Sequence, residues 1–250
     1  MIKIGIALVG LGPGSEPHLA SLAALQDRVD VRWCVTQGGA PQRQALLPGS
    51  TRFTTDLNEV LADTGVDAVV LATPAHTHLA IARQTLAAGK HTLVEKPLDI
   101  SLQRAEELVQ IAEASQLCFG VVLQHRFRAG AVRLRELLLS DALGQLQAGM
   151  LQVPWWRSQA GYYVQGGRGT RERDGGGVLL TQAIHSLDLF RSLVGVRKVV
   201  AAQVVTTAIH QMETEDFVSA LLTLGNGAPG NLMATTAMYQ LHRTGGRFAL

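Results

Sequence analysis

Charged and aromatic residues are both scarce in this chain of 250 residues, at 17% and 5% of the sequence. The low charge and the 47% apolar share exclude a disordered chain, because disordered segments are rich in charge and poor in branched apolar residues. The 22 basic residues nearly cancel the 20 acidic ones, which disfavours a nucleic-acid partner. The sequence also lacks a run of about 18 apolar residues without charge, so we expect no membrane span.

Cysteine is scarce as well, with Cys34 and Cys118 as the two examples, each within an apolar stretch. At this length a hydrophobic core suffices without a disulfide. We therefore expect two buried, reduced thiols in a cytoplasmic protein. The apolar residues 2–9 are too short for a secretion signal, and a glycine-rich turn follows them in place of a cleavage site. A buried strand is the better interpretation.

Strand and helix patterns alternate along the first half of the chain. Strands are predicted at residues 2–9, 29–35, 67–72, 91–95 and 117–123. A first helix is predicted from the apolar stripe Leu19–Leu22–Leu25, and a second after a capping box formed by Asp56 and Glu59. A third is predicted over 75–88, with Gly89 as its left-handed cap. A fourth is predicted after Ser101, and its apolar face is formed by Leu102, Ala105, Leu108, Val109 and Ala112. This alternation with short connections predicts an α/β fold with a doubly wound parallel sheet.

The second half has a different pattern, which predicts a second domain. Its strand candidates are residues 145–153, 196–207, 217–224 and 230–238, and one helix is expected over 178–194. The tripeptide Gly225-Asn226-Gly227 is typical of a hairpin. We predict an α+β domain with a mostly antiparallel sheet over residues 123–250, after a first domain over 1–122.

The turn after the first strand has the form of a dinucleotide-binding loop. Gly10 would permit the tight turn, Gly12 the approach of a pyrophosphate, and Pro13 a first helical turn. Gly14 adds backbone freedom, and Ser15 stands where the fingerprint has its third glycine. The free amides of the helix N-terminus would bind the anion. The alternative is a plain strand–helix turn.

The choice between NAD and NADP stays open, with NAD favoured. NAD enzymes usually carry a carboxylate at the end of the second strand, where this chain has Thr36. Without that carboxylate a 2′-phosphate would not be repelled, and Arg43 follows closely enough to attract one. The alternative for Arg43 is an ordinary solvated side chain.

Two segments hold residues that suit acid–base chemistry. Glu95-Lys96-Pro97 ends a predicted strand at the edge where open α/β sheets bind ligands. Thr181, His185 and Asp188 have the spacing of one helix face, while Leu180, Ile184, Leu187 and Phe190 are expected on the core side. The alternatives are a surface lysine paired with Glu95 and a structural histidine.

A third segment, residues 153–174, combines aromatic and basic residues. Trp155, Trp156, Tyr162 and Tyr163 suit sugar rings, and Arg157, Arg168, Arg171 and Arg173 suit a carboxylate or phosphate. The alternative is a lid or an interface arm. Gln124, His125 and Arg126 open the second domain, where they could touch substrate. His210, Glu213, Glu215 and Asp216 favour a polar link between strands over a metal site, because their spacing fits no ligand pattern.

Four stretches occur in one order: GLGPGS (10–15), ATPAHTH (72–78), AAGKHTLVEKPL (87–98) and DGGGVLLTQAIHSLDL (174–189). Together they resemble the Gfo/Idh/MocA family of oxidoreductases. The resemblance implies a Rossmann domain and a C-terminal domain whose open sheet forms the interface of a dimer or tetramer. It implies that Lys96 and His185 are catalytic, that the Lys96–Pro97 peptide is cis, and that Thr73, Pro74 and His78 line the nicotinamide beside Glu95.

The segment 153–174 looks most like the branch with UDP-N-acetylhexosaminuronic acid dehydrogenases. Two departures stand out: Thr181 replaces a frequent aspartate, and the chain ends sooner than its relatives, which raises the question of whether its site is complete. We expect an NAD(P)-dependent oxidoreductase acting on a sugar or nucleotide-sugar alcohol. The alternatives are a lyase or glycosidase with transient redox chemistry and a non-catalytic dinucleotide or sugar sensor.

The expected site residues complete this prediction, and no metal site is expected. Cofactor contacts are expected from Gly10, Gly12, Pro13, Gly14, Ser15, Thr36, Arg43, Thr73, Pro74, His78, Glu95, Lys96 and Pro97. Substrate contacts are expected from Lys96, His125, Arg126, Trp156, Arg157, Tyr163, Arg168, Thr181, Gln182 and His185.

Overall fold

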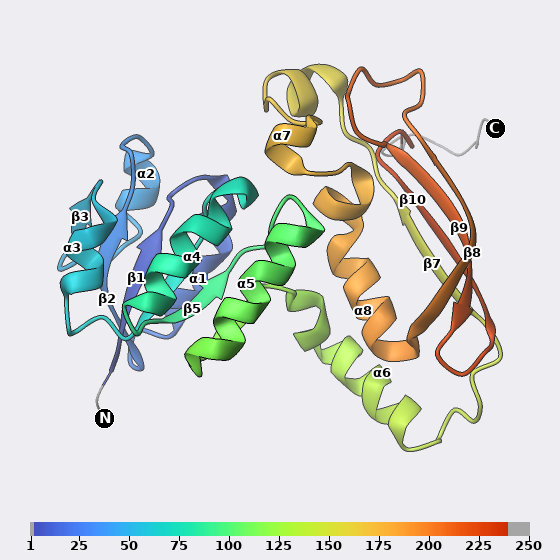
Figure 1. Ribbon diagram of the computed structural model, residues 1–250, viewed down its shortest axis with the longest axis horizontal. Helices are drawn as coiled ribbons and strands as arrows, with labels where there is room; N and C mark the ends of the chain where they lie inside the picture. The colour runs from blue at the N-terminus through green and yellow to red at the C-terminus, as the bar shows by residue number, and fades with distance from the viewer. Residues whose placement is uncertain (1–2, 240–250) are drawn as a thin grey trace, which may run out of the picture. The chain divides into compact units, whose positions relative to one another are not determined.

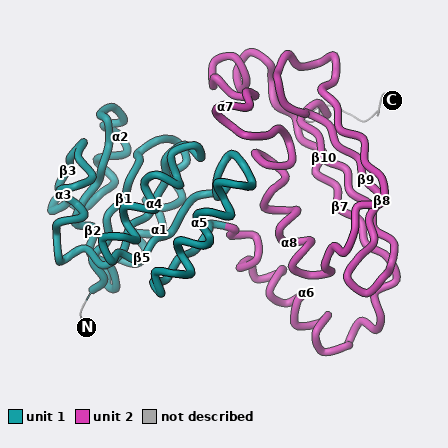
Figure 2. The backbone as a smooth tube through the Cα atoms, viewed as in Figure 1, with its two compact units in different colours: residues 1–122 teal, residues 123–250 magenta. Residues whose placement is uncertain are grey.

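The computed structural model describes residues 3–239 and divides the chain into two compact units. Unit 1 is Met1–Val122 and unit 2 is Leu123–Leu250 (Figure 2). Each unit has a sheet and a hydrophobic core of its own. No helix within residues 3–239 is both long enough and apolar enough to cross a membrane.

Unit 1 is a six-stranded parallel sheet in the order β3-β2-β1-β4-β5-β6, which confirms the predicted doubly wound fold (Figure 1). The strands are β1 (Ile4–Val9), β2 (Val29–Val35), β3 (Arg52–Thr54), β4 (Ala68–Leu71), β5 (His91–Val94) and β6 (Phe119–Val121). The helical segments are η1 (Pro13–Ser15), α1 (Glu16–Ala24), α2 (Pro41–Gln44), α3 (Leu57–Ala62), η2 (Ala75–Thr77), α4 (His78–Ala87) and α5 (Leu102–Ser115). The chain reverses its direction along the sheet between β1 and β4, where open α/β sheets bind ligands.

Both faces of this sheet are covered, as a continuous apolar strand requires. On β1, Ile6 and Leu8 pack with Leu19 and Leu22 of α1. The alternate residues of β1 pack on the other face, against α4 and α5. Some side chains that the sequence placed in this core are exposed, namely Leu25, Leu102, Val109 and Cys118. Each of them lies at or near an end of a helix or strand, or on the rim of a helix face.

Unit 2 holds a four-stranded sheet in the order β7-β10-β9-β8. Its strands are β7 (Gly149–Pro154), β8 (Val196–Val205), β9 (Phe217–Leu224) and β10 (Pro229–Thr235). Pairing is antiparallel except between β7 and β10, so the predicted mostly antiparallel sheet is confirmed. Residues 225–228 join β9 to β10 as the expected hairpin. The helical segments are η3 (Gln124–Phe127), α6 (Ala129–Leu139), η4 (Gln159–Val164), α7 (Arg171–Asp174), η5 (Leu179–Ala183) and α8 (Ile184–Val194).

The helix expected over 178–194 is two segments of different pitch. η5 is π-helical and α8 is α-helical, so the i, i+4 spacing assumed from the sequence does not hold across their junction. Leu187 and Phe190 pack on the core as expected, and Leu179 joins them there. The predicted capping box also differs from the structure. Asp56 caps α3 by accepting from the Asn58 amide at 2.9 Å, whereas the Asp56 amide donates to Thr54.

Candidate functional site

The loop between β1 and α1 is shaped to take an anionic group. Gly10 has φ +95°, and a Cβ there would lie 2.7 Å from the Ala72 carbonyl oxygen, so glycine is required. In contrast, a Cβ at Gly12 or Gly14 would meet nothing within 4 Å. The loop is therefore tight on its inner side and open on its outer side, where Pro13 begins η1. This geometry fits the pyrophosphate of a dinucleotide.

The contacts of Ser15 show why a serine fits where the dinucleotide-binding fingerprint has its third glycine. Its side chain is fully buried, and its hydroxyl donates to the Gly12 carbonyl at 2.7 Å. The Ser15 amide donates to the same carbonyl at 3.0 Å. The serine therefore closes the loop with a hydrogen bond that a glycine could not make.

The segment between β2 and β3 carries an arginine that is paired with a carboxylate. Arg43 lies on α2, and its Nε and Nη2 atoms donate to Glu16 Oε1 at 3.0 and 2.9 Å. Glu16 begins α1, so this ion pair ties α2 to the helix that follows the glycine loop. Thr36 lies at the end of β2, and its amide is bonded to the Thr54 carbonyl at 3.0 Å.

His78 is buried, with 1% of its surface exposed, between the loops that follow β4 and β5. Its Nε2 atom lies 2.9 Å from the Thr73 carbonyl, and its Nδ1 atom lies 3.0 Å from the Pro97 carbonyl. The ring thus joins the two loops from within. Thr73 contacts Thr77 through their hydroxyls, and Pro74 is exposed at the start of η2.

Glu95 binds a partner that the sequence interpretation missed. Its Oε1 atom lies 2.8 Å from His18 Nε2, and its Oε2 atom accepts from the Lys96 amide at 3.0 Å. The carboxylate therefore links α1 to the backbone of Lys96. The Lys96–Pro97 peptide is cis, as the resemblance implied. The signal for His18 was its place one turn into the helix that opens at Ser15.

In unit 2, His185 on α8 lies against His125 of η3, with ring centroids 5.0 Å apart and the rings tilted by 35°. Burial, and then the charge of Arg128, lowers the pKa of His125. Arg126 holds Asp188 with a bidentate contact, Nε to Oδ2 at 2.6 Å, and this pairing raises the pKa of Arg126. Asp188 is thus occupied by Arg126, and Thr181 donates to the Gly177 carbonyl at 2.8 Å.

Arg157, Tyr162, Arg168 and Gln182 form one cluster in unit 2. The guanidinium of Arg157 lies 5.2 Å from the Tyr162 ring and that of Arg168 lies 4.9 Å from it. Arg157 Nε donates to Gln182 Oε1 at 3.0 Å, and Gln182 in turn bonds the Tyr162 hydroxyl. Within residues 3–239, no carboxylate lies at ion-pair distance from Arg157 or Arg168. Two positive charges on one ring, without a carboxylate partner, suit an anionic ligand group.

Two aromatic residues expected at the substrate have inward contacts. Tyr163 is 6% exposed and its hydroxyl bonds that of Thr236 at 2.7 Å; burial is the main cause that raises its pKa. Trp156 lies against His210 with ring centroids 5.9 Å apart. Among the described residues, no group of three His, Cys, Asp or Glu side chains is arranged to hold a metal ion.

Both units match models of one protein family. Residues 4–123 match the GFO_IDH_MocA model, described as an oxidoreductase family with an NAD-binding Rossmann fold, and residues 131–248 match the GFO/IDH/MocA C-terminal domain. A crystal structure of the WlbA dehydrogenase from Bordetella pertussis in complex with NADH and UDP-GlcNAcA is 30% identical, with a TM-score of 0.85. That match covers 95% of this chain and 72% of the other.

Two curated bacterial relatives match over shorter stretches. The uncharacterized oxidoreductase YhhX of Escherichia coli is 32% identical over 144 residues, which are 57% of this chain and 42% of that protein. The scyllo-inositol 2-dehydrogenase (NAD(+)) of Bacillus subtilis is 29% identical over 159 residues, 63% of this chain and 44% of that protein. The aligned part is thus less than half the length of either relative.

Proposed function

The chain belongs to the Gfo/Idh/MocA family of oxidoreductases, and from this premise we propose that it transfers a hydride between a nicotinamide cofactor and a sugar or nucleotide sugar. The observation that carries the proposal is the meeting of three loops at one edge of the parallel sheet. The tight turn at Gly10 packs on the loop after β4, and His78 bonds that loop to the segment after Lys96. Such an edge is where doubly wound sheets bind dinucleotides.

Within this proposal the cofactor is NAD. Bound NAD would supply the acceptor of the hydride. The amides at the start of η1 and α1 would hold its pyrophosphate, as the open outer side of Gly12 and Gly14 allows. Because Glu16 neutralises Arg43, the end of β2 offers no uncompensated arginine there for a 2′-phosphate. This pairing supports NAD over NADP.

The substrate class follows from the cluster in unit 2. Arg157 and Arg168 flank Tyr162 without a carboxylate partner, which favours a ligand with its own anionic group. Aromatic rings beside them suit the apolar face of a sugar. The WlbA structure holds UDP-GlcNAcA, a nucleotide sugar with a carboxylate, and this supports the same class for this chain. We propose a UDP-linked hexosaminuronic acid as substrate.

Lys96 and His185 are proposed as the acid–base pair. His185 would take the proton of the reacting hydroxyl on an imidazole nitrogen, while the ammonium of Lys96 would polarise the same oxygen. The opposite assignment of these two roles is the alternative. Burial lowers the pKa of His125, which lies against His185, and so disfavours a second positive charge beside a protonated His185.

Single-turnover reduction of NAD with UDP-GlcNAcA tests this assignment. We expect Lys96→Ala and His185→Ala each to lower the rate by about 10²-fold or more, as loss of a general acid or base does. His76→Gln is the matched control, because His76 is exposed and lies two residues from His78. Near wild-type rates in both alanine variants would contradict the proposal. Turnover without NADH accumulation would favour transient redox chemistry, and binding without turnover a sensor.

A cytoplasmic location and a homo-oligomer formed through the sheet of unit 2 complete the proposal. Two free cysteines support the location, since thiols persist in reducing compartments. Exposed apolar side chains on that sheet support the oligomer, and Met150 and Leu221 are 66% and 54% exposed.

A further inference from the structure

His210 and Asp216 form a fully buried pair that the proposed chemistry does not use. Both side chains have 0% exposure, and His210 Nδ1 lies 2.7 Å from Asp216 Oδ2. The other ring nitrogen, Nε2, lies 2.8 Å from the Arg157 carbonyl oxygen. A carboxylate and a carbonyl both accept hydrogen bonds and neither donates. Each ring nitrogen of His210 therefore faces an acceptor, and both nitrogens must carry protons for both contacts to be hydrogen bonds.

Both oxygens of the Asp216 carboxylate have hydrogen-bond partners, as a buried carboxylate requires. Its Oδ1 atom accepts from the Thr207 amide at 2.7 Å, and its Oδ2 atom accepts from the Thr207 hydroxyl at 2.6 Å. The rings of Trp156 and Tyr163 lie against the imidazole, with centroids 5.9 and 4.8 Å away. Asp216 is thus the acidic group in contact with His210.

This pair holds the backbone of Arg157. The Arg157 carbonyl accepts from His210, and the Arg157 amide donates to the Thr236 carbonyl at 2.9 Å. The backbone carbonyl and the backbone amide of Arg157 are therefore both held by hydrogen bonds. The guanidinium then reaches Gln182 at 3.0 Å and the Trp156 carbonyl at 3.2 Å. A neutral amide in place of His210 could not donate in two opposite directions across this gap.

We propose that the His210–Asp216 ion pair is a positioning pair, which fixes Arg157 so that its guanidinium selects a substrate with a carboxylate. The inference rests on the proposed function for its substrate, and on the contacts above for its geometry. His210 acts through Arg157 and does not touch the substrate.

The first experiment needs no substrate. In ¹⁵N-labelled full-length protein, NMR should show a proton on both ring nitrogens of His210 and a slowly exchanging Arg157 Nε–H. In His210→Gln we expect that Arg157 proton to exchange at least about tenfold faster, since its arginine is no longer fixed. Ile209→Ala is the control, because Ile209 is the exposed neighbour of His210, and it should leave exchange unchanged. A single ring proton on His210, or unchanged exchange in His210→Gln, overturns the proposal.

The second experiment is a double-mutant cycle read by calorimetry with UDP-GlcNAcA and its neutral counterpart UDP-GlcNAc. We expect Arg157→Gln to abolish the preference for the acidic sugar and His210→Gln to reduce it by about tenfold, the effect of one charged hydrogen bond. The double variant should equal Arg157→Gln alone. Additive losses, or equal weakening of both sugars by His210→Gln, contradict a role through Arg157.

Thr207→Val is the milder variant, should His210→Gln fail to fold. It removes one of the bonds to Asp216, so we expect a smaller loss of preference in the same direction. If Thr207→Val folds, keeps its preference for the acidic sugar and shows unchanged exchange of the Arg157 Nε–H proton, the proposed role of His210 and Asp216 is contradicted. A wild-type protein that binds both sugars equally, with the NMR result as expected, would overturn the proposed substrate class and leave the positioning of Arg157 intact.

Discussion

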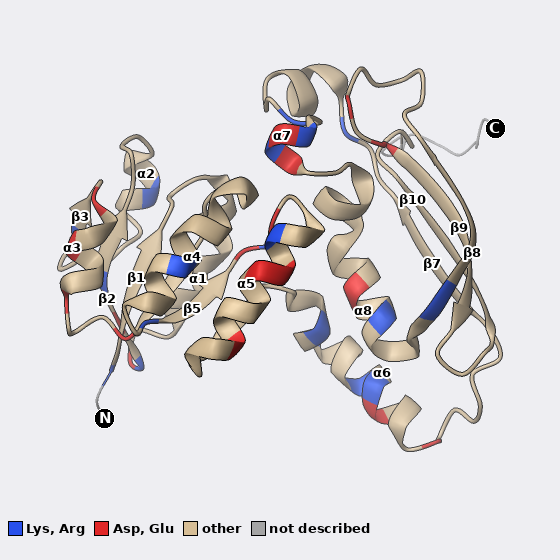
Figure 3. Cartoon of the chain, viewed as in Figure 1, with Lys and Arg blue, Asp and Glu red and all other residues tan. Residues whose placement is uncertain are grey.

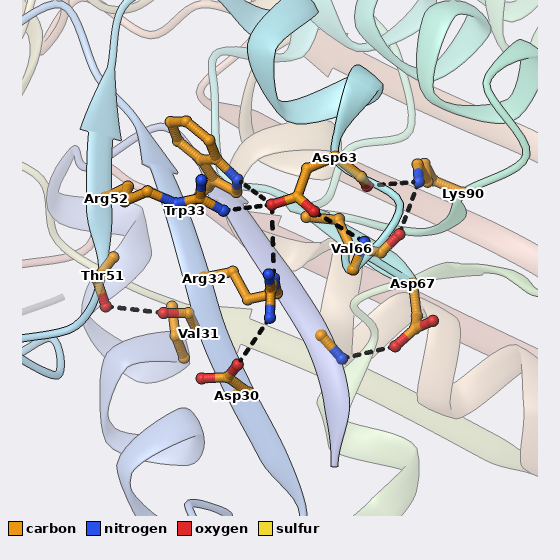
Figure 4. A network of polar contacts seen from close by, with 12 residues as sticks. Asp30, Val31, Arg32, Trp33, Thr51, Arg52, Asp63, Val66, Asp67 and Lys90 are labelled. Carbon is orange, nitrogen blue, oxygen red and sulfur yellow. Dashed lines mark hydrogen bonds and ion pairs between the residues drawn. The ribbon is translucent and has the colours of Figure 1, made fainter. Parts of the chain in front are cut away.

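The carboxylate of Asp63 lies within a network of polar contacts in unit 1 (Figure 4). Its Oδ2 atom accepts from the Trp33 indole at 2.8 Å and pairs with Arg52, and its Oδ1 atom accepts from the Gly65 amide at 2.8 Å. The Trp33 hydrogen bond is the largest of several causes that lower the pKa of Asp63 from 3.8 to about 2. Buried Lys90 completes the network by donating to the Asp63 and Val66 carbonyls.

This pKa predicts how stability depends on pH. A carboxylate with a depressed pKa stabilises the fold fully above its unfolded pKa, and the contribution is lost as pH falls from about 4 to about 2. We expect Asp63→Asn to lower the free energy of unfolding by about 1–2 kcal/mol at pH 7, after allowance for the solvent-exposed Arg52. The difference from wild type should shrink towards pH 2.

Urea unfolding at several pH values measures this difference. Asp30→Asn is the control, because the Asp30 side chain is 44% exposed and pairs with Arg32 at the longer distance of 3.4 Å; it should change stability by less than about 0.5 kcal/mol. An equal effect of Asp63→Asn at pH 7 and pH 2 would show that the charge of Asp63 is not the cause.

Single residues show the limit of interpretation from sequence. His78 and Glu95 belong to the segments that the motif pattern singled out, yet their partners are backbone carbonyls and His18. His18 lies 77 residues before Glu95 and Pro97 lies 19 residues after His78, so these contacts form only once the sheet is formed. Arg43 was ambiguous for the same reason, since Glu16 lies 27 residues before it. Residue type and spacing indicate which loops meet, whereas the partner of each side chain depends on the fold.

At the scale of elements, steric constraints require glycine at a single position of the β1–α1 turn, which is Gly10. Gly10 combines φ +95° with a close approach to the loop after β4. We expect Gly10→Ala to lower the free energy of unfolding by roughly 2–3 kcal/mol, from backbone strain and the contact with the Ala72 carbonyl. Gly14→Ala should be within about 0.5 kcal/mol of wild type, because a Cβ there meets nothing within 4 Å.

Thermal or urea unfolding without added NAD compares these two variants on stability alone. Equal stability of Gly10→Ala and Gly14→Ala would mean that the loop relaxes away from Ala72. NAD affinity, measured separately, then reports whether the outer side of the loop faces the cofactor.

Regular elements with strong patterns were predictable, and short or irregular ones were not. The strands β2, β4 and β9 coincide with apolar runs within a residue or two at their ends. The three-residue β3 and the four-residue α2 are too short for a periodic signal. The π-helical turn η5 has no signal in a pattern that assumes 3.6 residues per turn, so the faces of the His185 helix were mispredicted at its start. α6 was missed because none of its side chains is buried.

At the scale of the whole chain, charge and apolar surface have different distributions. Basic and acidic residues are interspersed over both units, and even the short α7 carries both signs (Figure 3). This mixture agrees with the small formal net charge of +2. Exposed apolar side chains, by contrast, gather on the sheet of unit 2, where Val199, Val204, Leu221 and Met150 are each more than half exposed.

The outer face of that sheet is the basis of the last prediction. Leu221 pairs in register with Asn231, and Asn231 with Met150, so the three side chains form a row across β9, β10 and β7. On β9, Val218, Ala220 and Leu222 point the other way into the core, which leaves Leu221 on the outside. Contiguous exposed apolar surface of this kind marks an interaction site, and a second copy of the sheet is its simplest partner.

We expect Leu221→Glu to shift the native protein from an oligomer to a monomer in sedimentation experiments, because each interface would bury two new carboxylates without partners. Leu102→Glu is the control, because Leu102 is 74% exposed but lies on α5 of unit 1, and it should leave the sedimentation unchanged. Circular dichroism of both variants separates loss of the interface from loss of the fold. A wild-type chain that sediments as a monomer at high concentration would contradict the prediction, and the exposed row on β7, β10 and β9 would then need a different partner.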